Sequence, residues 1–311
     1  MAFRSAAAVS GHAPTEGGAL RSQRAAAAQK YVYNVAGTPR RLIAEAAIRR
    51  ASIPVAAGVL LFGAVVLAHP TTIPAIAPAV GSPPACLRSL VLNFEANQVD
   101  NAREVPVWRM PDSSAFFFED GMTIDADGAP NAYNPDNTGL DDLANAGSPG
   151  HWGALAVDDD GNPFIQGLDD PFPGYYVSTT SLSDRTKKRN DPRKYVDASK
   201  VPFIVLPHDV AAQTGARVGD FAVVLNVRNG KTSNAIFADV GTMGEGSVAL
   251  ADNLGLWSNA REGGTRRGIF YLVFSGSGNG QPRSNDEINE QAENLLRDWG
   301  GTERMLSCSA N

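Results

Sequence analysis

Residues 201–254 read VPFIVLPHDVAAQTGARVGDFAVVLNVRNGKTSNAIFADVGTMGEGSVALADNL, and this stretch determines the expected fold. It contains three short runs in which β-branched and aromatic residues predominate, a composition that favours strands, and a fourth run of the same kind follows. The four runs are residues 201–206, 221–227, 235–240 and 269–274. Between the second and the third, Asn229-Gly230 predicts a hairpin turn, because both residues accept a positive φ.

Two helices are expected beside these strands. The first is short, covers residues 247–254 and ends at Gly255. The second covers residues 285–299, places its apolar side chains on one face and follows Ser284, a good N-cap residue. The segment 120–175 is instead rich in Asp, Gly, Asn and Pro, so we expect short strands and long connections there. The whole pattern predicts a mainly β fold with a few helices.

Charge divides the 311-residue chain into two parts. Residues 1–86 contain eight of the 27 Lys and Arg residues but only two of the 33 acidic residues. Residues 87–311 therefore carry 19 basic and 31 acidic residues, a net charge of −12. Such an acidic domain argues against nucleic acid as a partner, since phosphate binding depends on Lys and Arg, and fits a neutral or cationic ligand. The alternative is that the acidity serves only solubility.

The basic part contains one long apolar segment. Residues 51–68 (ASIPVAAGVLLFGAVVLA) are 18 residues without a charge, directly after Arg49 and Arg50, which predicts a signal anchor or transmembrane helix. Residues 1–50 are longer than the positively charged region that usually precedes the apolar part of a cleaved signal peptide. We therefore expect an uncleaved anchor, preceded by a disordered cytoplasmic segment. A start codon assigned too early would leave an ordinary cleaved signal peptide instead. A buried core helix is the third alternative.

The segment that follows predicts where the folded domain begins. Residues 69–86 are rich in Pro, Ala and small residues, a composition typical of an extended linker. We therefore expect residues 87–311 to form the domain and to lie outside the cytoplasm. The two cysteines, Cys86 and Cys308, bracket it; paired in an oxidising compartment, they would close a loop of about 220 residues and stabilise the fold by about 4 to 5 kcal/mol. Free thiols are the alternative.

Two acids stand out by their position. Asp239 lies near the end of the apolar run 235–240, where an ionisable side chain is costly unless it faces a cleft or has polar partners. Glu245 follows six residues later between two glycines, just before the expected short helix. A turn between them would set two carboxyl groups across a groove, which is what hydrolysis of a glycosidic bond requires. Alternatively, Glu245 favours the helix start electrostatically and Asp239 caps a turn.

Several motifs carry a resemblance to a known family. In chain order they are YVSTTSL at 176–182, YVDA at 195–198, VPFIVLP at 201–207, GD at 219–220, AIFADVG at 235–241, GEGSVALA at 244–251 and WGG at 299–301. In order and content, these motifs resemble the core of the family 75 glycoside hydrolases, the chitosanases. The run IDADGA at 124–129 extends the similarity more loosely toward residue 100.

The resemblance implies an endo-acting enzyme that cleaves the β-1,4 bonds of chitosan with inversion and needs no cofactor. It makes Asp239 and Glu245 the catalytic pair, and we expect Asp239 as general acid and Glu245 as general base. The order of strands, turn and helix in residues 201–254 is also similar to that of a double-psi β-barrel, in which an acid at a strand end works in an open groove. Chitosan carries ammonium groups, so an acidic cleft would attract it.

Asp125 and Asp127 are candidates for substrate binding, through the ammonium groups of glucosamine, or for binding calcium. The run lacks the remaining ligands of a calcium loop, and a solvated turn is the alternative. No cluster of Cys and His occurs in the sequence, so we expect no metal centre. Trp108, Trp152 and Trp257 are expected in the core, with stacking on sugar rings as the alternative.

Two further functions remain open from the sequence. One is a barrel without catalytic activity that binds cell-wall glycan and retains the acids for structure. The other is an enzyme that acts on peptidoglycan. The expected partners are thus chitosan, no nucleic acid, and a membrane through residues 51–68 if that segment is not cleaved.

Overall fold

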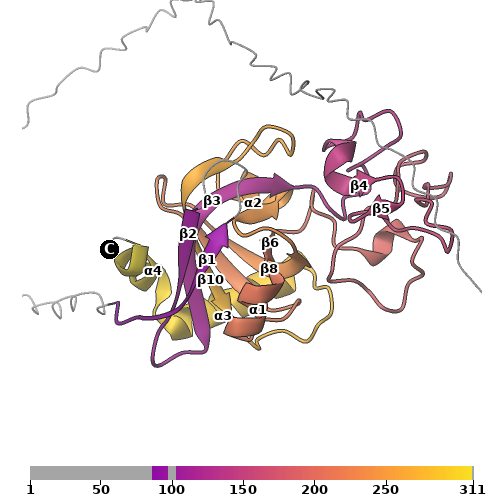
Figure 1. Cartoon of the computed structure of the whole chain (residues 1–311). Helices are drawn as coiled ribbons and strands as arrows, with labels where there is room; N and C mark the ends of the chain where they lie inside the picture. The colour runs from indigo at the N-terminus through magenta and orange to yellow at the C-terminus, as the bar shows by residue number, and fades with distance from the viewer. Residues whose placement is uncertain (1–85, 97–102, 310–311) are drawn as a thin grey trace, which may run out of the picture. The chain divides into compact units, whose positions relative to one another are not determined.

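The computed structural model describes residues 86–96 and 103–309 (Figure 1). The segments expected as a cytoplasmic region (1–50), a signal or membrane helix (51–68) and a linker (69–86, except Cys86) lie outside the described residues. Within the described ranges, we find no helix with the length and apolarity that a membrane span requires.

Eight strands form one sheet, and six of them close into a barrel. The strands are β1 (Ser89–Ala96), β2 (Arg103–Arg109), β3 (Ala115–Asp125), β6 (Phe203–Leu206), β7 (Phe221–Asn226), β8 (Thr232–Val240), β9 (Glu245–Ser247) and β10 (Thr265–Phe274). They follow the order β1-β2-β3-β10-β7-β8-β6-β9, and an additional pairing of β3 with β9 closes the last six. Two barrel pairings, β3–β9 and β6–β8, are parallel, and the others are antiparallel. The prediction of a mainly β fold is confirmed.

Four α-helices pack on this sheet. They are α1 (His208–Thr214), α2 (Val248–Asn253), α3 (Asn285–Trp299) and α4 (Gly301–Ser309), and the two 3-10 helices are η1 (Leu143–Ala146) and η2 (Pro192–Lys194). Both expected helices are confirmed. Ser247 caps α2 by accepting a hydrogen bond from the amide of Leu250, and Ser284 forms a capping box with Glu287 at the start of α3. The helices α1 and α4 were not expected.

The barrel strands are buried on both faces, which explains why they read as continuous apolar runs rather than as alternating patterns. In β3, Phe117 belongs to one hydrophobic cluster, whereas Phe116 and Phe118 belong to another. The Phe117 cluster includes residues of α3 and α4, and the second cluster includes residues of α1 and α2. Trp108 and Trp152 are partly buried against the first cluster, but Trp257 is 60% exposed, so its expected place in the core is wrong.

The turn between β7 and β8 confirms the expected hairpin but not its expected geometry. The amides of Asn229 and Gly230 both donate to the carbonyl of Asn226, at 3.3 and 2.9 Å. Of the pair expected to have positive φ, only Gly230 does, at 73°. The connection is therefore a longer turn of helical type, and a single glycine in the left-handed region is enough to close it.

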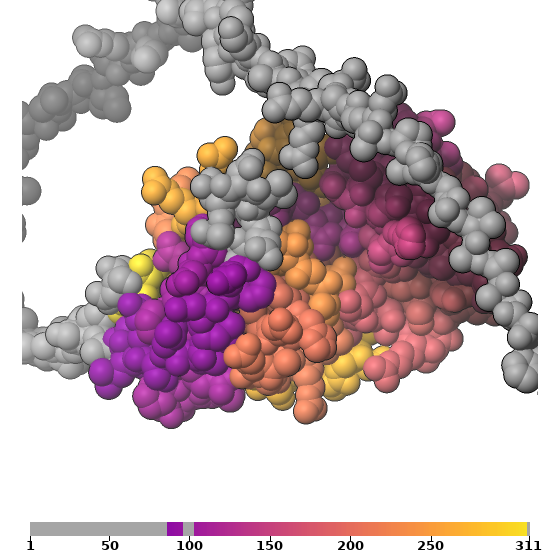
Figure 2. Space-filling model, in the orientation of Figure 1, coloured from indigo at the N-terminus to yellow at the C-terminus, as the bar shows by residue number. Residues whose placement is uncertain are grey.

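Residues 126–200 form a lobe beside the barrel, drawn in magenta to pink in Figures 1 and 2. Apart from the short pair β4 (Gly147–Ser148) and β5 (His151–Trp152), the lobe consists of turns, η1, η2 and isolated bridges, as its Asp, Gly and Pro content predicts. The amide of Leu182 donates to Ala238 of β8 at 2.8 Å, and the amide of Ala249 in α2 donates to Ala198 at 2.9 Å. The lobe is thus attached directly to the barrel.

One disulfide ties the two ends of the described domain together. It joins Cys86, just before β1, to Cys308 in α4, with the two Cα atoms 5.1 Å apart. Of the two alternatives for these cysteines, the structure contains the pair.

Candidate active site

A cleft of about 430 Å³ lies between the barrel and the lobe. All four acids singled out in the sequence line it: Asp125 at the end of β3, Asp127 in the lobe, Asp239 near the end of β8 and Glu245 at the start of β9. The remaining lining residues are Thr123, Ile124, Tyr133, Asp141, Asn145, Val205, Val240, Gly241 and Ala260. The fold therefore brings together acids from distant parts of the chain.

The carboxylate of Asp239 is held by hydrogen bonds from the lobe. Its Oδ1 accepts from the amide of Ser181 at 3.0 Å, from the Ser181 hydroxyl at 2.5 Å and from the amide of Val240 at 2.8 Å. Burial raises the pKa of Asp239, and these hydrogen bonds counteract that rise because they stabilise the ionised form. Ser181 belongs to the motif YVSTTSL, so one function of that motif is to supply donors to Asp239.

Glu245 opens the strand that closes the barrel. It is the first residue of β9, which pairs with both β3 and β6. It lies just before α2, as expected, and Ser247 is the N-cap of that helix. The Oε2 atom of Glu245 accepts a hydrogen bond from the amide of Thr242 at 3.0 Å. Burial raises the pKa of Glu245, Thr242 counteracts the rise, and the charges of Asp239 and Asp141 add to it.

The connection between the two acids runs close to the Glu245 side chain. A Cβ atom added at Gly241 would lie 3.1 Å from Oε2 of Glu245 and 3.0 Å from Cγ1 of Val205. Gly244 has a φ of 77°, which non-glycine residues rarely adopt. The two glycines thus allow a short turn to leave β8 and return directly into β9.

Asp125 and Asp127 face Asp239 within the cleft. One carboxylate oxygen from each of the three residues lies within 4.8 Å of the others. The amide of Asp127 donates to Oδ1 of Asp125 at 2.7 Å. Burial raises the pKa of both residues, and Asp239 adds to the rise at Asp125, as Asp125 does at Asp127. These carboxyl groups therefore favour a cationic ligand, which would relieve their mutual repulsion.

The three oxygens have the chemistry to hold a metal ion or an amine. Ca²⁺ takes about six to eight oxygen ligands, so water molecules or the second carboxylate oxygens would have to complete its shell here. An ammonium group carries three N–H donors, which three acceptor oxygens can satisfy. Among the described residues, the cluster is therefore a candidate site for a primary ammonium group.

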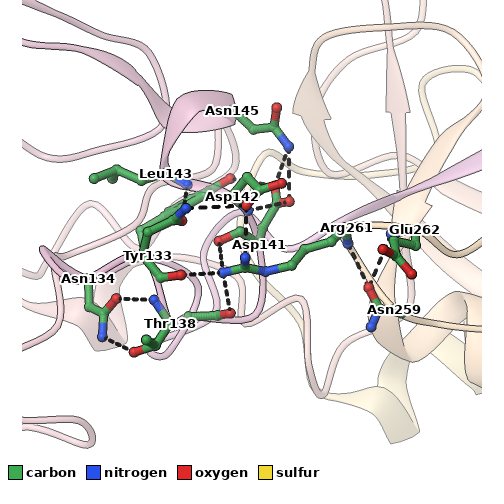
Figure 3. A network of polar contacts seen from close by, with 12 residues as sticks. Tyr133, Asn134, Thr138, Asp141, Asp142, Leu143, Asn145, Asn259, Arg261 and Glu262 are labelled. Atoms are coloured by element: carbon green, nitrogen blue, oxygen red, sulfur yellow. Dashed lines mark hydrogen bonds and ion pairs between the residues drawn. The ribbon is translucent and has the colours of Figure 1, made fainter. Parts of the chain in front are cut away.

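A second hydrogen-bonded group lies beside this cluster (Figure 3). The hydroxyl of Tyr133 lies 2.7 Å from Oδ1 of Asp127 and 3.2 Å from Oδ2 of Asp141, so its single proton is shared between the two carboxylates, with Asp127 nearer. Asp141 also accepts from the side-chain amide of Asn145 and from the amide of Asp142. Burial raises the pKa of Asp141, and these donors counteract the rise. Asp141 thus adds one more carboxylate to the cleft.

Asp239 and Glu245 differ in the groups that surround their carboxylates. Three hydrogen bonds, two of them from another segment of the chain, favour the ionised form of Asp239. Glu245 receives its donors from Thr242 alone, and the negative charges of Asp239 and Asp141 oppose its ionisation. The two carboxyl groups therefore lie in one cleft with different polar surroundings, which suits general acid and general base roles.

Several residues that line the cleft or bind its acids were missed in the sequence. Ser181 lies inside a quoted motif, so its presence was visible but its bond to Asp239 was not. Tyr133, Asp141 and Thr242 carry no local signal, since aspartates are common throughout the turn-rich segment that becomes the lobe. Their functional place depends on how the lobe folds against the barrel, which no local pattern records.

Comparison with known proteins identifies one family. The family model described as "Fungal chitosanase of glycosyl hydrolase group 75" matches residues 122–300 of the chain. The matched region contains every residue that lines the cleft. None of the curated proteins matches the chain.

Proposed function

Since the chain belongs to the fungal chitosanases of glycosyl hydrolase group 75, we propose that it is an endo-acting hydrolase that cleaves the β-1,4 bonds of chitosan with inversion. Family membership makes it a glycosidase acting on chitosan. The observation that carries the finer proposal is the presence of Asp239 and Glu245 in one cleft, each with its own hydrogen-bond donors.

In the proposed reaction, Glu245 is the general acid and Asp239 the general base, the reverse of the order expected from the sequence. Glu245 gives its proton to the glycosidic oxygen as the bond from that oxygen to the anomeric carbon breaks. Asp239 takes a proton from a water molecule whose oxygen attacks the anomeric carbon from the opposite side. One water is consumed for each bond cleaved, and the proton on Asp239 then returns to Glu245 through solvent. The hydrogen bonds from Ser181 support this order, because a base must be ionised before it accepts a proton.

Substrate binding in the proposal relies on the other acids of the cleft. Asp125 and Asp127 receive the ammonium group of one glucosamine unit, next to the carboxylate of Asp239. The net charge of −12 over residues 87–311 attracts the cationic polymer and raises its concentration near the cleft.

We further propose that the barrel is of the double-psi type and that the domain works outside the cytoplasm. The two parallel pairings, β3–β9 and β6–β8, support the first proposal. The disulfide between Cys86 and Cys308 supports the second, because such bonds persist in oxidising compartments. The proposed signal or membrane helix at residues 51–68 lies outside the described part of the chain.

The test is the release of reducing ends from chitosan by the full chain and by two variants. We expect Glu245→Gln and Asp239→Asn each to lower kcat by about 10²- to 10⁴-fold, the usual contribution of a general acid or base. Glu290→Gln, which removes an exposed carboxylate from α3, is the matched control and should leave the rate unchanged. A rapid fall in viscosity relative to reducing ends would support endo action.

Three results would overturn the proposal. Unchanged release by Glu245→Gln would exclude it as the acid. Retention of chitosan without any release by the wild-type chain would favour a glycan-binding barrel. Release from peptidoglycan but not from chitosan, in a parallel assay, would indicate a different substrate.

A further inference from the structure

Arg261 connects the two sides of the cleft. It lies in the connection between α2 and β10, and its guanidinium forms hydrogen bonds with the lobe (Figure 3). Nη1 donates to Oδ1 of Asp142 at 2.8 Å, and Nη2 lies 2.8, 3.0 and 3.1 Å from the carbonyl oxygens of Asn137, Gly139 and Asp141. One side chain from the connection between α2 and β10 thus binds four acceptors on a single lobe loop, residues 134–142.

The segment that carries Arg261 is itself fixed. The side-chain oxygen of Asn259 accepts from the amides of Arg261 and Glu262, at 2.9 and 3.1 Å. The amide of Gly264 donates to the carbonyl of Trp257 at 2.7 Å. Gly264 has a φ of 93°, and a Cβ atom there would lie 2.0 Å from the carbonyl oxygen of Met122, so the end of this segment packs directly on β3. Arg261 therefore extends from a segment that is fixed by its own hydrogen bonds and by packing on β3.

The loop that Arg261 binds presents acidic groups to the cleft. The carbonyl oxygen of Asp141 accepts a hydrogen bond from Arg261. The carboxylate of Asp141 lies near the Tyr133 hydroxyl and accepts from the side-chain amide of Asn145. Tyr133 in turn donates to Asp127. A continuous series of contacts thus runs from Arg261 through Asp141 and Tyr133 to Asp127, one of the carboxylates proposed to bind the substrate ammonium group.

Charge explains why such an anchor is needed. Asp141 lies in a cleft that already contains Asp125, Asp127, Asp239 and Glu245, so like-charge repulsion opposes the position of its loop. The ion pair of Arg261 is made with Asp142, which is 46% exposed. The guanidinium therefore holds the loop through three carbonyl oxygens and the exposed carboxylate of Asp142. The carboxylates inside the cleft are not neutralised by Arg261 and remain available for a cationic substrate.

We propose that Arg261 is a positioning residue that fixes the loop 134–142 against the barrel and thereby sets Asp141, Tyr133 and Asp127 for productive binding of one sugar unit. The inference rests on the proposed function, because it assigns the loop a role in binding chitosan. It adds to that function a latch between lobe and barrel, made by one arginine and four acceptors.

The latch has a consequence for the pH dependence of catalysis. The titratable groups that face Glu245 are Asp239 of β8, Asp125 of β3, Tyr271 of β10 and Asp141 of the loop. Only Asp141 is held by Arg261. If the loop moves away, the negative charge of Asp141 moves with it, so Glu245 loses its proton at lower pH. The alkaline limb of the pH profile of kcat/KM should then move to lower pH.

The test uses the full chain with Arg261→Ala, Arg261→Lys and Asp142→Asn. We expect Arg261→Ala to lower kcat/KM by about 10- to 100-fold, since a displacement of about 1 Å in a positioning element has such an effect. Arg261→Lys should restore part of the loss, because one ammonium group cannot reach all four acceptors. Asp142→Asn, at an exposed position, should produce a smaller shift of the alkaline limb in the same direction.

The matched control is Arg193→Ala. Arg193 also joins two segments of the lobe, through Oδ1 of Asp170 at 3.0 Å and the carbonyl of Asp169 at 2.8 Å, but it does not line the cleft. Its loss should reduce the thermal midpoint about as much as the loss of Arg261, with kcat/KM within about twofold of the wild type. Thermal midpoints of all variants separate loss of position from loss of folding.

A coupling measurement completes the test. Asp141→Asn should move the alkaline limb to lower pH, and adding Arg261→Ala should move it little further, because both changes remove the same charge from Glu245. An unmoved limb in Arg261→Ala, or a loss of activity no larger than in Arg193→Ala, would overturn the latch. An inactive wild type or an active Glu245→Gln variant would instead refute the proposed function itself, so the two failures are distinguishable.

Discussion

At the scale of single residues, Ser181 determines how strongly the carboxylate of Asp239 is stabilised. Its hydroxyl supplies the shortest of the three hydrogen bonds to Oδ1. In Ser181→Ala the amide donor remains but the hydroxyl donor is lost, so the pKa of Asp239 rises. We expect the acidic limb of kcat/KM to move to higher pH, and activity below the optimum to fall by up to about tenfold, the equivalent of about 1.4 kcal/mol.

Ser199→Ala provides the control for this change. The Ser199 hydroxyl donates to Oδ1 of Asp197 at 2.6 Å, so the same kind of bond is removed from a turn that does not line the cleft. Its pH profile should match that of the wild type. If Ser181→Ala also left the acidic limb in place, Asp239 would not be the group that must be ionised.

The proposed catalytic pair could be predicted from the sequence because both acids occupy unusual local positions. An ionisable residue near the end of an apolar strand and a glutamate between two glycines are visible without a structure. The relative proton affinity of the two acids was not accessible. It depends on Ser181 and Asp141, which approach from the lobe. The proposed order of acid and base, the reverse of the one expected from the sequence, is based on these contacts.

At the scale of elements, Ser247 joins the strand that carries Glu245 to its neighbours. Its buried hydroxyl oxygen accepts from the amides of Phe203 and Leu250, at 2.9 and 3.1 Å, and donates to the carbonyl of Val201 at 2.9 Å. Ser247→Ala removes the N-cap of α2. It also removes the hydrogen-bond partner of the Phe203 amide in β6 and of the Val201 carbonyl just before β6. We expect the free energy of unfolding to fall by about 3 kcal/mol, measured by urea denaturation.

Ser284→Ala tests the cap alone. Ser284 caps α3 at an exposed position, so its loss should lower the free energy of unfolding by about 1 kcal/mol. Equal effects of the two substitutions would show that the contacts of Ser247 with the β6 region contribute nothing.

The elements were predicted far better than their pairing. The strands β6, β7, β8 and β10 are recognisable because burial on both faces produces continuous β-branched and aromatic runs. Closure of the barrel through β3 and β9 could not be predicted, since it pairs segments far apart in the chain. Helix α4 was missed because Gly300 and Gly301, both with positive φ, resemble an end of helical structure. Here they form a bend between two helices.

At the scale of the whole molecule, the disulfide links the first and last described elements across a separation of 222 residues. A cross-link of that span restricts the unfolded chain strongly, and its loss should cost about 5 kcal/mol of stability in the loop-closure description. We therefore expect reduction with dithiothreitol to lower the urea midpoint of the wild type. The double variant Cys86→Ser/Cys308→Ser should have the same lower midpoint and should not respond to dithiothreitol.

A measurement of activity tests whether the disulfide affects only stability. Cys86 and Cys308 lie outside the cleft, so the double variant should retain its kcat/KM on chitosan under conditions in which it stays folded. A midpoint unchanged by reduction would contradict the stabilising role of the bond.

In the proposed mechanism, a water molecule is activated on the side opposite the bond that Glu245 protonates. The anomeric form of the first product reports this directly. Proton NMR of chitosan oligomers, recorded during the first minutes of hydrolysis by the full wild-type chain, distinguishes the two anomers before they equilibrate. Direct attack of water on a β-linked substrate, with Asp239 as base and Glu245 as acid, predicts that the α-anomer forms first. Initial formation of the β-anomer would mean retention through a covalent intermediate and would contradict the account.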